Sequence, residues 1–401
     1  MATPKWWVCV REKDQIMNKV TKQESILSLR LLNIESCLTS FIIFMPVAYL
    51  LFKDVGLNQF QIGLTQFIFA ITMLVTQVPT GYIADKFSRK ASNFSGDIFI
   101  AIAVMIDFLA GNFWHIVIAE ILFGIGLSLT NGADAALIKG HAENSGKDYK
   151  KINARLSQYA FIFQGLGAIV GGLMGAHGIR WPFLAQAIIF IIAAGFSLFI
   201  KNIGKKRTSE VHPIKDAYLI TKYCLHGHKK LAWRMLLGSS LVSSTLVIVW
   251  LLTPSFLKAG IPIGWHGVMF ALISVAAVFG GQLVIKNPKL KKTTPFLFAG
   301  LAYLTLSLDI SMFTILIFLM TSFARGINES TVKPFIQEEV SEDIQATALS
   351  VFDMLYRVFG ASLGLLVNYI ANNGVQYGMA ACFIVTALFY IIFRLNRKKY
   401  A

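Results

Sequence analysis

The sequence has few charged residues for its length. Asp, Glu, Lys and Arg make up only 14% of its 401 residues, and apolar residues make up 55%, whereas globular proteins have about 25% and about 45–50%. The apolar residues fall into blocks of about 18 to 25, and about 20 are needed for a helix to cross a bilayer. The composition therefore excludes a chain of two or three soluble domains and predicts an all-α integral membrane protein with many spans.

Patterns that build disulfide, metal or catalytic sites are also scarce. The four cysteines, Cys9, Cys37, Cys224 and Cys382, lie far apart, so no disulfide or metal site is expected. No His-Glu-x-x-His, Gly-x-Ser-x-Gly or paired-carboxylate motif lies where a catalytic site is expected, and no Gly-x-x-x-x-Gly-Lys-Ser/Thr loop occurs. The sequence therefore predicts no enzyme, no metal, no cofactor and no ATP-driven process.

Reading along the chain gives twelve apolar segments, which one long polar stretch divides into six and six. The predicted spans lie near residues 31–52, 59–82, 94–111, 113–138, 156–177, 182–201, 235–257, 264–285, 294–309, 311–333, 346–370 and 375–395. We therefore expect a tail at 1–30, a six-helix bundle at 31–200, a linker at 201–234, a second six-helix bundle at 235–395 and a tail at 396–401. A sensor or scaffold would be expected to carry a soluble output domain, and the linker is too short to be one.

The chain carries a formal net charge of +16, which either nucleic-acid binding or membrane topology could explain. Its 37 Lys and Arg residues are unevenly divided between the gaps. Only Lys53, Arg180 and Lys258 fall in gaps on the side opposite the N-terminus, and only Arg325 and Arg357 fall inside spans. Because cytoplasmic loops of membrane proteins carry the excess of Lys and Arg, we expect both termini in the cytoplasm and no nucleic-acid partner.

The gap between the second and third predicted spans is unusually rich in charge. Its sequence, VPTGYIADKFSRK (78–90), ends one apolar run and precedes another. It resembles the signature loop of the major facilitator superfamily, Gly-x-Leu-Ala-Asp-Arg-x-Gly-Arg-Lys, and occupies the same gap of a chain with twelve spans. The matching residues are Gly81, Ala84, Asp85, Arg89 and Lys90, while Lys86 and Ser88 replace an arginine and a glycine.

The resemblance implies a fold of two pseudo-symmetric six-helix bundles and a secondary transporter that works by alternating access. It further implies a multi-pass protein of the bacterial inner membrane, expected as a monomer. In the family this loop is a cytoplasmic gate, in which Asp85 faces the start of span 11, Arg89 pairs with Asp134, and Gly81 permits close helix approach. The alternative is a hairpin whose charges simply stay in water, and we accept that reading for Lys86 and Lys90.

Ionisable residues inside spans are energetically expensive and are therefore candidates for function. They are Glu35, Asp97, Asp107, Glu120, Asp134, Arg325, Glu329, Asp353 and Arg357. Asp107 and Asp134 lie near span ends and could reach water. The remaining residues need partners or a cavity.

Several of these residues lie on spans 1, 4, 7 and 10, which line the central cavity in the family. We therefore expect the cavity to be lined by Glu35, Thr39, Glu120, Asn131, Ser240, Ser243, Arg325 and Glu329. The alternative for the last two is a local ion pair that serves packing alone. On span 11, Asp353 and Arg357 share a helix face with two glycines at a small-xxx-small spacing. We expect these two to join the gate from the second bundle, with cavity lining as the alternative.

The sequence says least about the identity of the solute and about the group that couples transport to protons. A buried carboxyl group can carry a proton, and Glu35 is the first choice for this role, followed by Glu120. Arg325 and Lys333 favour a small anionic or zwitterionic organic solute, a metabolite or chelate. Drug exporters of the superfamily often carry Gly-x-x-x-Gly-Pro-x-x-Gly-Gly on span 5, but here Ala168 stands in place of the proline. A proton-antiport multidrug or siderophore exporter is therefore the alternative.

Overall fold

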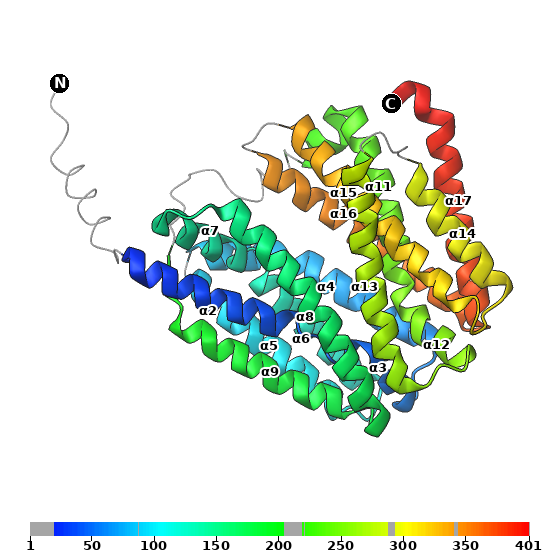
Figure 1. The fold of residues 1–401 in the computed structure, drawn as a ribbon, viewed down its shortest axis with the longest axis horizontal. Helices are drawn as coiled ribbons and strands as arrows, with labels where there is room; N and C mark the ends of the chain where they lie inside the picture. The colour runs from blue at the N-terminus through cyan, green and yellow to red at the C-terminus, as the bar shows by residue number, and fades with distance from the viewer. Residues whose placement is uncertain are drawn as a thin grey trace.

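A computed structural model describes residues 20–86, 88–203, 219, 221–287, 293–340 and 344–400. Every regular element in these ranges is a helix (Figure 1). We call the helices before residues 204–218 the N-terminal half and those after them the C-terminal half. Most of the predicted linker lies outside the described residues.

The N-terminal half begins with a capping box, in which Thr21 and Glu24 bond to each other's backbone N–H groups. Its helices are α2 (Lys22–Ser40), α3 (Met45–Asp54), α4 (Gln59–Lys86), α5 (Arg89–Phe108), α6 (Phe113–Thr130), α7 (Ala133–Ser145), α8 (Tyr149–His177) and α9 (Trp181–Phe199). The C-terminal half contains a π-helical turn (Tyr223–Gly227), α11 (Lys229–Val247), α12 (Val249–Lys258), α13 (Ile263–Lys286), α14 (Thr294–Leu308), a 3₁₀ turn (Ile315–Ile317), α15 (Phe318–Glu339), α16 (Gln345–Ala371) and α17 (Val375–Tyr400).

Some membrane segments are broken helices. The axes of α2 and α3 meet at 44°, and α6 gives way to α7 at Gly132, whose φ of +89° favours glycine. Nine helices in the described residues are long and apolar enough to cross a membrane, and the α2–α3 pair would make ten. Helix α14 is shorter and α15 carries several charges, and both lie where the ninth and tenth spans are predicted. The total of twelve spans stays a prediction.

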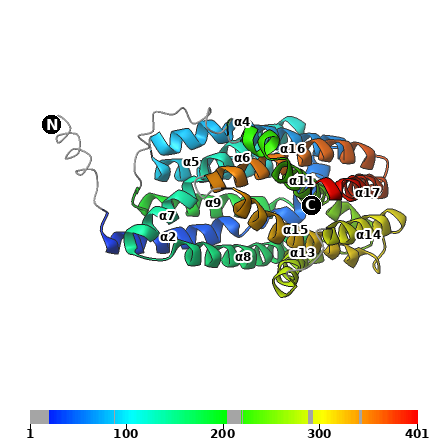
Figure 2. The ribbon, with the colours of Figure 1, turned by 90° about the horizontal axis from the view of Figure 1, so that it is seen from above.

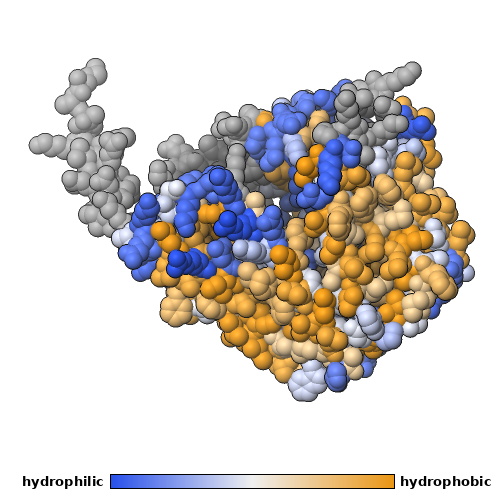
Figure 3. All heavy atoms as spheres, viewed as in Figure 1, coloured by the Kyte–Doolittle hydropathy of each residue, from blue (hydrophilic) through white to orange (hydrophobic). Residues whose placement is uncertain are grey.

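Most of the outer surface along the helices is apolar. Figure 3 shows hydrophobic atoms over the long sides of the helices and hydrophilic atoms gathered near α7 and along the upper edge of the view, near the ends of α15 and α16. Single side chains such as Phe313, which is 92% exposed, would be unfavourable in water. This surface fits a protein surrounded by lipid.

The two halves meet along two seams, α4 against α16 and α8 against α13, on opposite sides of the molecule (Figure 2). The second seam is built on glycine. A Cβ placed on Gly172 would lie 2.6 Å from the backbone nitrogen of Gly267, and one on Gly267 would overlap the carbonyl of Ala168. The missing side chains therefore let the backbones of α8 and α13 touch.

The Gly267→Leu substitution is expected to lower the thermal unfolding midpoint in detergent, because overpacking costs about 1–3 kcal/mol. The matched control is Gly300→Leu on α14, where an added Cβ meets no described atom within 4 Å. Equal midpoints for the two variants would contradict the glycine contact as the basis of this seam.

Candidate functional site

A cavity of about 350 Å³ lies between the two halves. Much of its wall is aromatic, which is typical of sites for organic ligands. The rings are Phe44, Phe52, Phe69 and Phe123 from the N-terminal half and Trp250 and Phe270 from the C-terminal half. Phe52 and Trp250 stack across the interface, with ring centroids 5.5 Å apart and planes 8° apart. We call this space the solute cavity.

The N-terminal half contributes acidic groups to the solute cavity. Glu120, which lies on predicted span 4, lines this cavity. Its Oε1 accepts a hydrogen bond of 2.5 Å from Gln66 Nε2 on α4. Asp107 at the end of α5 also lines the cavity, although its position near a span end predicted contact with water. Its side chain is 7% exposed, and its Oδ1 has no hydrogen-bond partner among the described residues.

The C-terminal half contributes a cation. Arg325 on α15 lines the solute cavity opposite the two acids. Its Nε lies 3.9 Å from Glu329 Oε1, and Glu329 Oε2 lies 3.6 Å from Lys333 Nζ. The local ion pair weighed for these residues is therefore present, but it leaves Arg325 at the cavity. Glu329 does not belong to the lining described for the solute cavity.

Four predicted cavity or gate residues lie in a second space, of about 260 Å³, inside the N-terminal half. Its polar lining consists of Glu35, Ser36, Thr39, Asn93, Asp97, Thr130, Asn131 and Asp134. We call it the acidic cavity. Glu35 and Thr39 therefore do not line the same space as Arg325, because α2 packs against α7, α8 and α9 of its own half.

Glu35 is held firmly at one oxygen. Its Oε1 accepts hydrogen bonds of 2.5 Å from Asn93 Nδ2 and 2.6 Å from Ser197 Oγ. Its Oε2 is buried and has no partner in the described part of the chain. The carboxyl group of Asp97 on α5 lies beside it, within interaction range.

The predicted serines of span 7 do not line the solute cavity. Ser240 Oγ donates to the Leu237 carbonyl at 2.8 Å, and Ser243 Oγ donates at 2.7 Å to the carbonyls of Ser239 and Tyr356. Hydroxyl groups in membrane helices commonly bond to carbonyls one turn back. The polar face of α11 therefore serves close packing on α16, which corrects the prediction for these two residues.

Part of the predicted gate departs from expectation. A Cβ at Gly81 would meet no described atom within 4 Å, so this glycine does not mark a close helix approach. The side chain of Asp85 lies outside the described residues. Asp134 lines the acidic cavity, within electrostatic range of Glu35. The pairing of Arg89 with Asp134 stays a prediction.

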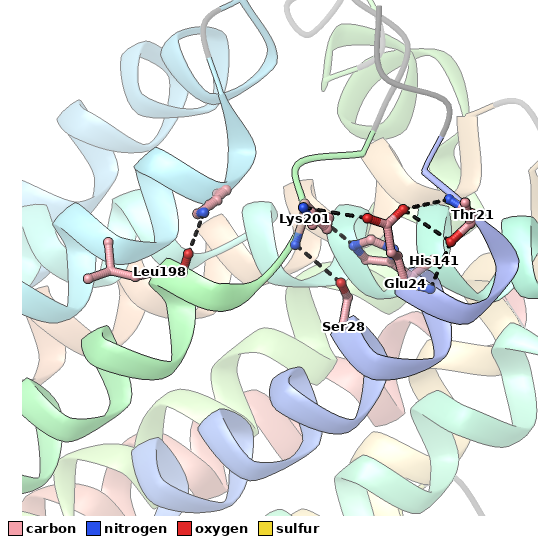
Figure 4. Close-up of polar contacts among 7 residues, drawn as sticks. Thr21, Glu24, Ser28, His141, Leu198 and Lys201 are labelled. Atoms are coloured by element: carbon pink, nitrogen blue, oxygen red, sulfur yellow. Dashed lines mark hydrogen bonds and ion pairs between the residues drawn. The ribbon is translucent and has the colours of Figure 1, made fainter.

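The end of the N-terminal half around this loop is tied together by polar contacts (Figure 4). Lys90, which was expected to be solvated, donates from Nζ to the Leu198 carbonyl at 2.5 Å. Lys201 donates from its backbone to Ser28 Oγ at 3.2 Å and pairs with Glu24 at 3.5 Å. His141 Nε2 lies 2.9 Å from the carbonyl of Lys201. These contacts join α2, α5, α7 and the end of α9 into one unit.

Arg357 connects the halves through a contact with a methionine sulfur. Its Nη1 lies 3.5 Å from Met73 Sδ on α4, and its guanidinium lies 5.5 Å from the ring centroid of Tyr356. Asp353 lies near Lys333 and Arg357 at the same end of the interface. Neither Asp353 nor Arg357 belongs to the wall of the solute cavity, but Arg357 lines an adjoining space between the halves that shares Gln66 and Trp250 with it. The gate role and the cavity-lining alternative both stay predictions.

The opposite end of the interface is closed by residues that the sequence did not single out. Gln59 Nε2, at the start of α4, donates to Asn368 Oδ1 of α16 at 2.6 Å. The backbone N–H of Gln59 donates to Asn372 Oδ1 at 3.2 Å. Gly63 allows this approach, because a Cβ there would lie 2.6 Å from Asn368 Cβ. We call Gln59, Asn368 and Asn372 the amide clasp.

The site residues that the sequence did not reveal are mainly amide side chains and aromatic rings. Gln66, Gln59 and Asn368 are uncharged, and an amide in an apolar run gives no periodic signal of its own. The available signal was their position inside predicted spans, where a polar side chain needs a partner. Within the described residues, no group of three or more His, Cys, Asp or Glu could hold a metal ion.

The Gln59→Ala substitution is expected to open the end closed by the amide clasp, because each lost hydrogen bond contributes about 1 kcal/mol. The measurement is the distance distribution between spin labels at Lys53→Cys and Asn373→Cys, both exposed, in a background without native cysteines. A larger population at long distance is expected. Gln61→Ala is the matched control, since Gln61 bonds only locally to Asn58 in the described contacts, and an equal effect from it would contradict the clasp.

Known proteins are similar in sequence to part of this chain. The quinolone resistance protein NorA of Staphylococcus aureus is 24% identical over 179 residues, which cover 44% of this chain and 45% of NorA. The uncharacterized transporter BU466 of Buchnera aphidicola is 26% identical over 203 residues, covering 50% of each chain. The chain thus matches about half the length of these relatives.

Solved structures share the fold over nearly the whole chain. A bacterial homologue of the human lysosomal transporter Spinster, in an inward-facing and unoccupied conformation, has a TM-score of 0.74 at 15% identity, covering 94% of this chain and 98% of its own. The nucleoside transporter NupG has a TM-score of 0.70 at 16% identity, covering 93% and 98%. At such low identity, these structures show the fold alone.

The sequence profile of the Major Facilitator Superfamily matches residues 35–365, which include most helices of both halves. The all-α membrane fold predicted from the signature loop and the apolar blocks is confirmed by the structure and its neighbours. The chain belongs to the Major Facilitator Superfamily.

Proposed function

We propose that the protein is a secondary active transporter that moves a small organic solute across a bacterial inner membrane by alternating access. In this proposal it works as a monomer, with both termini in the cytoplasm, and is coupled to protons. The membership of the superfamily supports the class of activity. The two-half architecture supports the mechanism, since such transporters place their site between repeats near the middle of the membrane.

The observation that carries the proposal is the charge arrangement of the solute cavity. Glu120 and Asp107 come from one half and Arg325 from the other, and aromatic rings form much of the remaining wall. A solute that bridges the halves would meet acids on one side and a guanidinium on the other. We therefore favour a zwitterion with an apolar, aromatic body, carrying an amine toward Glu120 and a carboxylate toward Arg325.

The closed amide clasp and the divergence of the halves toward α7 support alternating access (Figure 1). In the orientation that places basic loops in the cytoplasm, the clasp lies on the outer side. The structure then corresponds to a cytoplasm-facing state. In such a state the gate formed by Asp85 and Arg89 is expected to be open, and it would close when the clasp separates.

Export is a second candidate, carried by the match to NorA, whose name identifies it as a quinolone resistance protein. The aromatic wall also suits planar drugs. Opposing this, Ala168 stands where exporters of the superfamily often carry proline, and its carbonyl is part of the glycine seam instead. The sign of the pH gradient that supports uptake into proteoliposomes distinguishes import from export.

The solute proposal is tested with purified protein and a quinolone that carries both an amine and a carboxylate. Binding is measured by thermal shift, and uptake into proteoliposomes is measured with pH gradients of either sign. Glu120→Gln and Arg325→Gln are each expected to weaken binding at least about tenfold, since a hydrogen bond to a charged group contributes about 1.5–3 kcal/mol and about 1.4 kcal/mol is tenfold.

The matched control is Glu143→Gln, which makes the same change as Glu120→Gln in an exposed pair with Lys139 on α7. Unchanged affinity in both cavity variants would reject the zwitterion assignment. The sign of the gradient that supports uptake identifies import or export.

Proton coupling makes a separate prediction. Glu35→Gln is expected to abolish uptake driven by a pH gradient, because the amide cannot release a proton, while counterflow exchange of the same quinolone stays measurable. Glu120→Gln, the second choice, is compared at a quinolone concentration raised to offset its weaker binding. Uptake driven by the pH gradient that is unchanged in Glu35→Gln would reject Glu35 as the coupling group.

A further inference from the structure

The acidic cavity contains three carboxyl groups that the solute cavity does not use. Glu35 comes from α2, Asp97 from α5 and Asp134 from α7, so that all three belong to the N-terminal half. Of the described residues, no Lys, Arg or His lines this space. A cluster of acids without a base is unfavourable in a membrane protein unless something positive accompanies it.

Two of the three groups are almost completely buried. Glu35 is 4% exposed and Asp97 is 1% exposed. Glu35 Oε2 and Asp97 Oδ2 are both buried without a hydrogen-bond partner in the described residues, and both side chains line the cavity. Because an ionised carboxylate removed from water costs several kcal/mol unless it is paired, two interacting carboxyl groups that each keep an unpartnered oxygen are a place where a cation is stabilised.

The surrounding residues hold this arrangement in position. Asn93 and Asp97 are four residues apart on α5 and therefore lie on the same face of the helix. Asn93 and Ser197, from α5 and α9, both donate to Glu35 Oε1. These two bonds fix the carboxyl plane and leave Oε2 free beside Asp97. One oxygen is thus anchored while the other is available to a ligand.

Asp134 has a different place in the cavity. It lies in the first turn of α7, directly after the break at Gly132, and unlike the other two it is exposed. It lies within electrostatic range of both Glu35 and Asp97. A mobile cation would therefore meet Asp134 before it reaches the buried pair.

We propose that the acidic cavity is a binding site for one small monovalent cation, a proton or a sodium ion, held between Glu35 Oε2 and Asp97 Oδ2 with Asp134 at its entrance. A proton would be covalently bound to one carboxyl group and hydrogen-bonded to the other. The site is separate from the solute cavity, but Ile42, Phe44 and Phe123 line both spaces and form their common wall. Use of the cation to drive transport rests on the proposed function, whereas its binding does not.

The test uses the full-length protein in detergent without solute. For the proton, infrared difference spectra between acid and alkaline buffers report the C=O band of protonated carboxyl groups. For sodium, the thermal unfolding midpoint is compared in sodium chloride and choline chloride of equal ionic strength, in alkaline buffer. A band that disappears in alkaline buffer identifies the proton, and a midpoint raised by sodium identifies sodium.

Glu35→Gln and Asp97→Asn are both expected to abolish the sodium response or to remove the component of the proton band that Glu120 and Asp107 do not produce, and Asp134→Asn is expected to weaken it. Glu143→Gln on the surface of α7 is expected to retain it. The proposal is overturned if wild-type protein shows neither response, or if both buried variants keep the wild-type response in full. If the buried variants do not fold, the wild-type and Asp134→Asn measurements decide, since an undiminished response in Asp134→Asn also counts against the site. Quinolone binding that persists when both responses are absent would overturn this inference alone.

Discussion

The cost of placing charge inside a membrane is the constraint on which this structure depends. Each ionisable side chain within a span needs a partner, a proton or a water-filled space. The chain meets this requirement by placing Asp107, Glu120, Glu35, Asp97 and Asp134 in two cavities, and Glu329 and Asp353 near cations of the C-terminal half. The rest of the molecule is then free to be apolar and to pack through small residues, as α8 and α13 do.

Much of the fold was predictable because this constraint acts on sequence directly. Apolar blocks, the uneven distribution of Lys and Arg, and the signature loop at 78–90 identify an all-α membrane protein of this superfamily. Residues of the site were predictable only where a charged side chain lies inside a span. Glu120 and Arg325 lie at the solute cavity, whereas Glu35, which was expected there, is buried in the acidic cavity of the N-terminal half.

Other features depend on geometry that no local pattern reports. The serines of α11 look like a polar cavity face, but a hydroxyl group can satisfy itself on its own helix, as Ser240 does. Helix α2 packs on α7, α8 and α9, so Glu35 and Thr39 line a space within one half. Gln59 and Asn368 are 309 residues apart in sequence, and their contact exists only because the halves close at that end.

The glycine seam has a mechanical consequence. Where helices interlock through large side chains, sliding or tilting requires those side chains to change rotamer, and this creates a barrier. Along α8 and α13 the contacts at Gly172 and Gly267 are between backbones, so no interlocked side chains have to separate. In the proposed alternating access, such a seam would let the two halves tilt against each other without any side chain changing its rotamer.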